Sequence, residues 1–283
     1  MILENRSHFE VERMCRTMDV SRSGYYRWES QEMSRRDREN ERLVFEIRRA
    51  HDQSRKVYGS PRITEELKDQ GLACSENRIA RLMKLHGIAA KTKKKFKVTT
   101  HSNHHLPIAK DRVKRDFYPE RPNKIWASDI TYIGTGEGWL YLTVVMDLYS
   151  RKIVGWSMKD RLYREIVLDA FNQALGRRNP PPGLIFHSDH GVQYASKEFR
   201  EALKARGVLC SMSRTGNCYD NACLESFFHT LKTELVYHER YLTRKEAEKS
   251  IFEYIEVFYN RQRRHSLLNH KSPDIFEQTV ELS

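Results

Sequence analysis

The spacing of apolar residues divides the chain into a helical N-terminal part and a later part that mixes strands with helices. Over the first 90 residues, apolar positions recur at intervals of three and four, the period of an amphipathic helix. From Lys124 onward, runs rich in β-branched and aromatic residues alternate with helical segments. Strands of a mixed sheet with helices to either side make an α/β fold. We therefore predict all-α modules followed by an α/β domain.

Two short helical pairs are predicted in the N-terminal part. In the first pair, apolar spacing predicts a helix over residues 11–18, a break over 19–21, and a second helix in "RSGYYRW" that carries Arg22. This order is typical of a helix-turn-helix, whose second helix reads DNA. A helical bundle that binds nothing fits the same pattern.

The second pair follows a long amphipathic helix that carries Leu43 and Ile47. Helix-start and helix-stop signals then alternate in the order Ser60 with Pro61, Gly71, Ser75 and Gly87. The expected shared core consists of Ile63, Leu67, Ile79, Leu82 and Met83. Arg78 and Arg81 fall on the last helix, which we expect to be the reading helix of a second helix-turn-helix.

Positive charge is concentrated in the first part of the chain. Of the net charge of +12, residues 1–120 carry 27 Lys and Arg against 18 Asp and Glu, and residues 121–283 carry 23 against 20. No acid occurs between Glu76 and Asp111, whereas Lys93, Lys94 and Lys95 lie in that interval. Such a run suits the phosphates of a nucleic acid, although a solvated linker has the same composition.

The later part begins with three runs that predict an antiparallel meander: "KIWASDITYI", "WLYLTVVMDLYS" and "RKIVGWSM". The alternation of a strand places Asp129 on the same face as Ile125, Ala127 and Ile133. A helix over 166–175, a strand "LIFHSD", a helix over 196–207, a strand "VLCSM" and a helix "DNACLESFFHTLK" follow in that order.

Three acids stand out in this region. Asp129 lies within a strand on an apolar face, Asp189 ends a strand, and Glu225 lies beside the apolar stripe of the last helix. If they converged, their charges would repel one another unless divalent cations lay among them. Oxygen ligands favour magnesium or manganese over zinc, and two such ions about 4 Å apart form a phosphoryl-transfer site.

Each of these acids has an alternative interpretation. Glu225 can form a salt bridge with Lys232 on the same helix. Asp147 is a rival metal ligand, but it precedes a turn, where Asp commonly caps the bend, so we favour a structural role for it. His187 and His190 flank Asp189 and can contact DNA or a metal, or His187 can simply line the site.

Composition excludes several other classes of protein. No apolar run approaches the roughly 18 residues of a membrane span, and the first residues lack the apolar core of a signal peptide. The five cysteines contain no C-x-x-C pair, which argues against a disulfide framework and a zinc finger. We expect a cytoplasmic protein that does not associate with membranes.

The spacing of the acids resembles a known catalytic motif. Asp189 and Glu225 have 35 residues between them, and Lys232 follows Glu225 by seven. This resembles the DD(35)E catalytic domain of retroviral-type integrases and bacterial insertion-sequence transposases. The fuller strings resemble the second-frame (OrfB) transposases of the insertion-sequence-3 family, and they are "VSRSGYYRW", "YGSPRI", "WASDITYI", "DLYSRKIVGW", "HSDHGVQY", "GNCYDNACLESFFHTLKTEL" and "YNRQRRHSLLNHKSP". The resemblance therefore covers nearly the whole chain.

The resemblance implies a ribonuclease-H-like fold in which Asp129, Asp189 and Glu225 are the catalytic and metal-binding triad for two Mg²⁺ or Mn²⁺ ions. Lys232 and Asn221 match positions near terminal DNA. We expect Arg261, Arg263, Arg264 and His265 to hold DNA backbone or to form an exposed basic helix end. The expected organisation is a helix-turn-helix segment over 1–34, a helical DNA-binding domain over 35–90, a basic linker over 91–120, an integrase catalytic core over 121–240 and a helical basic tail over 241–283.

The implied reaction is metal-dependent cleavage at the 3′ end of an element strand, followed by transfer of that end to another phosphodiester. The implied partners are double-stranded DNA, namely the terminal inverted repeats and the target, a second copy of the chain, and an upstream-frame (OrfA) protein as partner or fusion. We expect the protein to lie on the bacterial nucleoid. A ribonuclease-H-type nuclease and a non-catalytic DNA-binding regulator are the alternatives.

Overall fold

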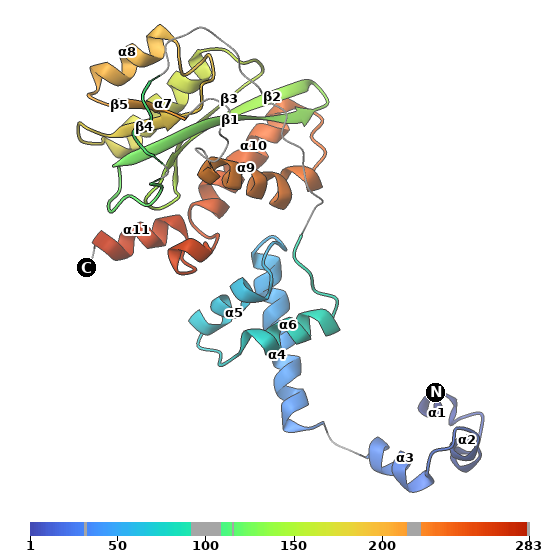
Figure 1. Cartoon of the computed structure of the whole chain (residues 1–283). Helices are drawn as coiled ribbons and strands as arrows, with labels where there is room; N and C mark the ends of the chain where they lie inside the picture. The colour runs from blue at the N-terminus through green and yellow to red at the C-terminus, as the bar shows by residue number, and fades with distance from the viewer. Residues whose placement is uncertain (31–32, 92–108, 115, 214–221, 282–283) are drawn as a thin grey trace.

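The computed structural model describes residues 1–30, 33–91, 109–114, 116–213 and 222–281. Of the predicted site residues, Lys93, Lys94, Lys95 and Asn221 lie outside the described residues. Within the described ranges, no helix combines the length and the apolar character that a membrane crossing requires. The described chain forms a small N-terminal helical group, a second helical module and a sheet domain (Figure 1).

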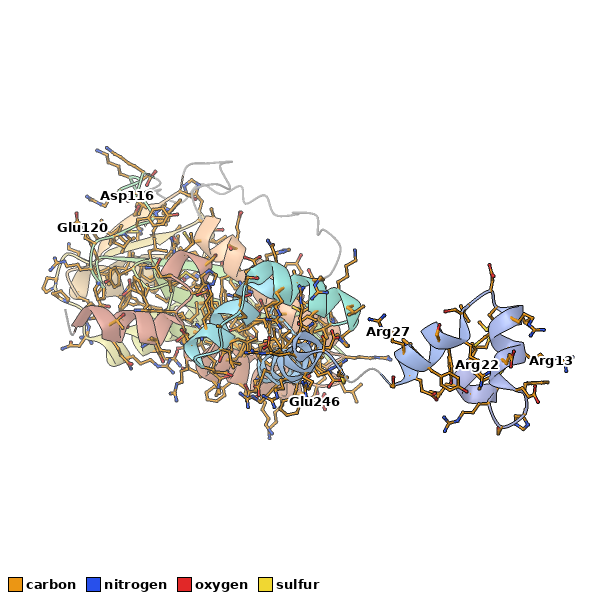
Figure 2. The ribbon with its side chains drawn as sticks, turned by 90° about the horizontal axis from the view of Figure 1, so that it is seen from below. Arg13, Arg22, Arg27, Asp116, Glu120 and Glu246 are labelled. Atoms are coloured by element: carbon orange, nitrogen blue, oxygen red, sulfur yellow. The ribbon has the colours of Figure 1, made fainter. Side chains whose placement is uncertain are left out.

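The N-terminal group contains α1 (Ile2–Asn5), α2 (Val11–Thr17) and α3 (Arg22–Glu29). The predicted pair α2 and α3 is confirmed, and the Ser21 hydroxyl caps α3 by accepting a hydrogen bond from the backbone N–H of Gly24. Ile2, Cys15 and Tyr25 form its small core. Both views show this group set apart from the rest of the protein (Figures 1 and 2). Figure 2 labels Arg13, Arg22 and Arg27 on it.

The second module contains α4 (Arg35–Gln53), α5 (Ser60–Asp69) and α6 (Glu76–Leu85), which agree with the predicted start and stop signals. The Ser75 hydroxyl accepts from the N–H of Arg78 at the start of α6. Gly71 and Gly87 follow helix ends with φ of +80° and +63°, a conformation that favours glycine. All five predicted core residues are buried.

The sheet has the strand order β3-β2-β1-β4-β5. Its strands are β1 (Ile125–Thr135), β2 (Gly138–Asp147), β3 (Ile153–Lys159), β4 (Ile185–Ser188) and β5 (Leu209–Met212). The first three strands pair antiparallel, so the predicted meander is confirmed, whereas β4 pairs parallel with both β1 and β5. This mixed five-stranded sheet with helices confirms the predicted ribonuclease-H-like α/β fold.

Helices cover both faces of the sheet (Figure 1). On one face lie α7 (Glu165–Arg178) and α8 (Lys197–Ala205), with a core that includes Trp126, Phe171 and Phe186. A Cβ at Gly155 of β3 would lie 2.2 Å from the carbonyl oxygen of Ala170, so glycine lets α7 pack directly on the strand. On the other face lie α9 (Ala222–Glu234), α10 (Arg244–Glu253) and the π-helix η3 (Tyr254–Tyr259).

The short 3₁₀ helix η2 (Val236–His238) joins α9 to α10, and after η3 the C-terminal tail continues through the 3₁₀ helix η4 (Ser266–Leu268) to α11 (Pro273–Glu281). Two contacts of the tail are buried ion pairs. Arg263 pairs with Glu234 of α9 at 2.7 Å, and Glu277 of α11 pairs with Arg178 of α7 at 2.7 Å. These pairs fix the tail to helices on both faces of the sheet.

The tail also holds the second helical module. Arg264 pairs with Glu66 at 2.8 Å and with Asp69 at 2.6 Å, and its backbone N–H donates to the Tyr58 hydroxyl. The same hydroxyl donates to the carbonyl oxygen of Gln262. The hydrophobic core of this module is continuous with the core beneath the sheet. The module is therefore docked on the sheet domain and its tail.

We predict that Glu277→Gln destabilises the protein by about 1.5–3 kcal/mol at pH 7, the range for hydrogen bonds to charged groups. Burial alone would raise the pKa of Glu277. Hydrogen bonds from Arg178 and Ser150, together with the charge of Arg178, hold this pKa below its ordinary value. A lowered pKa contributes stability above the unfolded value of about 4.3, and this stability is lost as pH falls through the folded pKa.

Urea unfolding at pH 7 and at pH 3 measures this difference, which shrinks at the lower pH. The exposed carboxylate of Glu201 provides a control, since Glu201→Gln changes stability by less than about 0.5 kcal/mol. An equal effect of the two substitutions at pH 7 would contradict the role of Glu277.

Candidate functional site

The parallel pairing of β1 with β4 places two of the predicted acids side by side. Ser128 of β1 is the register partner of Ser188 of β4. Asp129 and Asp189 each follow these residues, so they occupy adjacent positions where the parallel pairing of β1 with β4 ends, Asp129 within β1 and Asp189 just after β4. Neighbouring strands lie about 4.8 Å apart, which sets the separation of the two backbones.

Local hydrogen bonds orient both carboxylates. Oδ1 of Asp129 accepts from the backbone N–H of Ile130 at 2.8 Å, and Oδ1 of Asp189 accepts from the N–H of Gly191 at 2.8 Å. Tyr194 is fully buried, and its hydroxyl lies 2.8 Å from the Ser128 Oγ. Burial and then the charges of Asp129 and Asp189 raise the pKa of Tyr194 well above its ordinary value.

Helix α9 brings the third acid and the predicted lysine toward Asp129. Its predicted apolar stripe is buried and consists of Leu224, Phe227, Phe228 and Leu231. Glu225 is exposed on the adjoining side, and Lys232 is half-buried two turns later. The ammonium group of Lys232 lies 5.2 Å from the centroid of the Tyr132 ring.

Electrostatics link these four groups into one site. Burial, then the charge of Asp189, raises the pKa of Asp129 well above its usual range, and Glu225 raises it further. The backbone N–H of Ile130 and the charge of Lys232 act in the opposite direction. Burial lowers the pKa of Lys232, and Asp129 opposes that shift. The site therefore carries negative charge that a single lysine compensates only in part.

In the described part of the chain, no three His, Cys, Asp or Glu side chains are grouped so as to hold a metal ion. The described arrangement juxtaposes Asp129 and Asp189 and brings Glu225 within electrostatic range, but the three carboxylates do not form a closed cage. The donors are hard oxygens with excess negative charge, a set that fits a divalent cation such as Mg²⁺.

Other candidate ligands have structural partners. The Nδ1 atom of His187 lies 2.9 Å from the Ser211 Oγ, so this buried ring joins β4 to β5 and lines the site. Asp147 accepts from the N–H groups of Asn123 and Tyr149 and pairs with Arg178. The preferred interpretation of Asp147 as a structural residue that caps the turn is therefore confirmed.

The predicted DNA-binding arginines differ in their surroundings. Arg22, Arg81 and Arg261 are exposed. The Arg78 guanidinium donates to the Asn40 side chain of α4 at 2.9 Å. Arg264 is occupied by Glu66 and Asp69 in the docking contact already described.

Two predictions about the tail are corrected. Arg263 was expected to contact DNA or to lie on an exposed helix end, but it is buried against Glu234. His265 is half-buried beside Arg263, and burial together with that charge lowers its pKa to about 3. Both expectations rested on the run of basic residues in "YNRQRRHS", which does not reveal that an acid from α9 pairs with one of them.

Sequence reasoning missed Ser128, Tyr194 and Tyr132 as neighbours of the acids. The alternation of β1 gave a partial signal, because Ser128 precedes Asp129 and is a polar residue on the opposite, buried face. Tyr194 lies within the motif "HSDHGVQY", but its position beneath both acids depends on the β1–β4 register.

Comparisons with known proteins agree with the fold. The family model "Integrase core domain" matches residues 119–218, a second model of that description matches 225–280, and "HTH-like domain" matches 37–96. The insertion element IS600 uncharacterized 31 kDa protein of Shigella sonnei is 46% identical over 265 residues, covering 94% of this chain and 97% of that protein. The transposase InsF for insertion sequence IS3A of Escherichia coli (strain K12) is 41% identical over 282 residues, covering 98% and 96%.

Among solved structures, the intasome of simian T-cell lymphotropic virus, in complex with PP2A regulatory subunit B56 gamma, matches with a TM-score of 0.49 and 17% identity. That match covers 82% of this chain and 74% of the other.

We predict that Asp129→Asn stabilises the protein by about 0.5–2 kcal/mol at pH 7.5 in EDTA, the range common for relief of an unfavourable native feature. The substitution removes a charge that Asp189 and Glu225 repel, and the Asn oxygen still accepts from Ile130. Thermal or urea unfolding measures the change.

The matched control is Asp169→Asn, whose carboxylate pairs with Lys159 in partial contact with solvent. This change stays within about 0.5 kcal/mol. Destabilisation by Asp129→Asn in the absence of divalent ions would show that the carboxylate is structurally required and would refute the repulsion.

Proposed function

Because this chain belongs to the insertion-sequence-3 family of DNA transposases, we propose that Asp129, Asp189 and Glu225 form its catalytic site. The observation that carries this proposal is the β1–β4 register, which makes Asp129 and Asp189 neighbours where the parallel pairing ends. The charge of Glu225 acts on the same carboxyl group. The sequence spacing of the last two acids agrees with the DD(35)E motif.

The three carboxylates would hold two Mg²⁺ or Mn²⁺ ions. When bound, such ions neutralise phosphate charge and make water or a hydroxyl a stronger nucleophile at neutral pH. The fit rests on the donor chemistry, since all three ligands offer oxygens and their repulsion is relieved by positive charge. A small movement of α9 toward β1 would complete the ligand set.

The proposed reaction has two steps, and both involve the 3′ end of one element strand. In the first, water attacks the phosphorus at the element end, and the bond to the 3′ oxygen of the element breaks. In the second, this freed 3′ hydroxyl attacks another phosphodiester, and the 3′ oxygen of the attacked strand leaves. Asp129 and Asp189 orient the reacting groups, and the ammonium group of Lys232 holds a phosphate next to the break.

Recognition of the element ends falls to the basic helices in this proposal. Arg22 on α3, Arg81 on α6 and Arg261 in the tail are exposed cations that can reach phosphates. In this proposal we retain the prediction that Lys93, Lys94, Lys95 and Asn221 contact DNA. Because two element ends need two active sites, the active form is at least a dimer, with an upstream-frame (OrfA) protein as a further partner.

We predict that Asp129→Asn, Asp189→Asn and Glu225→Gln each lower strand cleavage and strand joining by at least about 100-fold, since each removes a charged ligand. Binding of terminal-repeat DNA stays within about threefold of wild type, because the DNA-gripping helices are unchanged. Gel assays with labelled element ends measure both steps, and Asp169→Asn is the control. Wild-type cleavage by any triad variant would remove that residue from the catalytic site.

We predict that Arg81→Ala weakens binding to terminal DNA and lowers the slope of log affinity against log salt by about one, because one phosphate contact is lost. Fluorescence anisotropy at salt concentrations between about 50 and 200 mM measures this slope. Lys197→Ala on α8 is the control, since its exposed cation lies outside the helical modules. Equal slopes for Arg81→Ala and wild type would exclude Arg81 from the interface.

A further inference from the structure

An aromatic side chain faces solvent at the hairpin that joins β1 to β2. Trp139 is 52% exposed, whereas Leu140 and Leu142, which follow it on β2, are buried. A single exposed apolar residue needs no special explanation. What distinguishes Trp139 is the set of side chains beside it, which leads toward the proposed catalytic site.

Aromatic and charged groups form a row that leads from Trp139 to the helix of Glu225. The Trp139 ring meets the Tyr132 ring edge-on, with centroids 5.0 Å apart and planes at 79°. The Lys232 ammonium group lies 5.2 Å from the centroid of the same Tyr132 ring. Lys232 lies on α9 two turns after Glu225. One end of the row is therefore an exposed ring, and the other end is the helix that carries a proposed catalytic carboxylate.

The hairpin that carries Trp139 is held rigidly. Nε of Arg244 donates to the carbonyl oxygen of Trp139 at 3.1 Å, and its Nη2 donates to that of Glu137 at 2.7 Å. The N–H of Gly136 donates to the carbonyl oxygen of Tyr241 at 3.0 Å. The backbones pack so closely here that a Cβ at Gly136 would lie 2.5 Å from the carbonyl oxygen of Leu242. Trp139 is thus presented on a fixed support.

We propose that Trp139, backed by Tyr132, stacks on an unpaired base of the element end next to the cleaved phosphate. This inference rests on the proposed function. Every base has a π-face that an aromatic ring can stack on, and stacking is worth about 1–3 kcal/mol per base. Bases inside a duplex are already stacked on their neighbours, so an exposed protein ring is available only to a base that has left its pair.

The dimensions agree with a base close to the reacting phosphate. Lys232, which contacts the Tyr132 ring, follows Glu225 by seven residues on α9, a span of about 10 Å along a helix. A DNA strand rises about 3.4 Å per nucleotide, so this span corresponds to about three nucleotides. Lys232, which lies between the ring and the carboxylate, is suited to the phosphate that connects them. A protein partner would have to desolvate this ammonium group, which makes it the less favourable occupant.

The experiment uses the full chain and an element-end duplex with 2-aminopurine in an unpaired position among the last three nucleotides. It is carried out in EDTA, so that no strand is cut. Wild type quenches the fluorescence at least about twofold through stacking. Trp139→Ala loses the quenching, and Trp139→Phe, which keeps a ring, retains part of it. Leu242→Ala removes an exposed neighbour of the hairpin and quenches as wild type does.

A second measurement links stacking to the reaction. With divalent ions present, Trp139→Ala cleaves a fully paired end at least about fivefold more slowly, and an end made with mismatched terminal bases restores part of the rate. Quenching by Trp139→Ala equal to wild type would overturn the proposal. A change in sedimentation of Trp139→Ala without any change in quenching would instead assign the ring to a protein interface, which also overturns it.

Failure of this proposal and failure of the proposed function give different results. If triad variants lose cleavage while Trp139→Ala still quenches, only the stacking site is wrong. If triad variants keep full cleavage, the catalytic assignment itself is wrong, whatever the fluorescence shows.

Discussion

The parallel pairing of β1 with β4 is the constraint on which the candidate site depends. Asp129 and Asp189 are distant in the sequence, and they become neighbours because Ser128 and Ser188 are register partners. A shift of one residue would turn one of these side chains to the opposite face. The register is held by Trp126, Phe186 and other aromatic side chains of the core beneath α7 and α8. The contact of Tyr194 with Ser128 also holds it.

The same pairing brings carboxylates together at an electrostatic cost. The packing of the rest of the fold has to keep them together against this cost. Burial, then the neighbouring carboxylate of Asp189 and that of Glu225 on α9, raise the pKa of Asp129, so its charge is unfavourable without a cation. Helix α9 is kept against the sheet by its buried apolar stripe and by the Glu234–Arg263 ion pair near its end. The tail that supplies Arg263 also supplies Arg264, which docks the second helical module. Helix α9 and the second helical module therefore share one support.

Much of this fold follows from local patterns in the sequence. Caps and glycine stops marked the helices of the second module, and alternation placed Asp129 on the face that α9 covers. The turn position of Asp147 was enough to predict its structural role. These features depend on neighbours within a few residues, which a sequence displays directly.

Other features depend on contacts between distant segments. The burial of Arg263, the docking of Arg264 on α5 and the position of Tyr194 beneath both acids are set by tertiary packing, and a basic run or a motif does not encode which partner arrives. The row from Trp139 to Lys232 likewise joins a hairpin to a helix that comes much later in the chain. The short helix α1 was not predicted, because four residues carry too little periodicity to indicate a helix.

The central claim is that Asp129, Asp189 and Glu225 jointly bind divalent cations. The most direct measurement is anomalous X-ray diffraction from crystals of the full chain grown with Mn²⁺. The account predicts an anomalous peak that contacts carboxylate oxygens of Asp129 and Asp189, with Glu225 moved into contact with bound manganese. At saturating Mn²⁺, the absence of an anomalous peak between these side chains, or manganese bound only at other residues, would contradict the account.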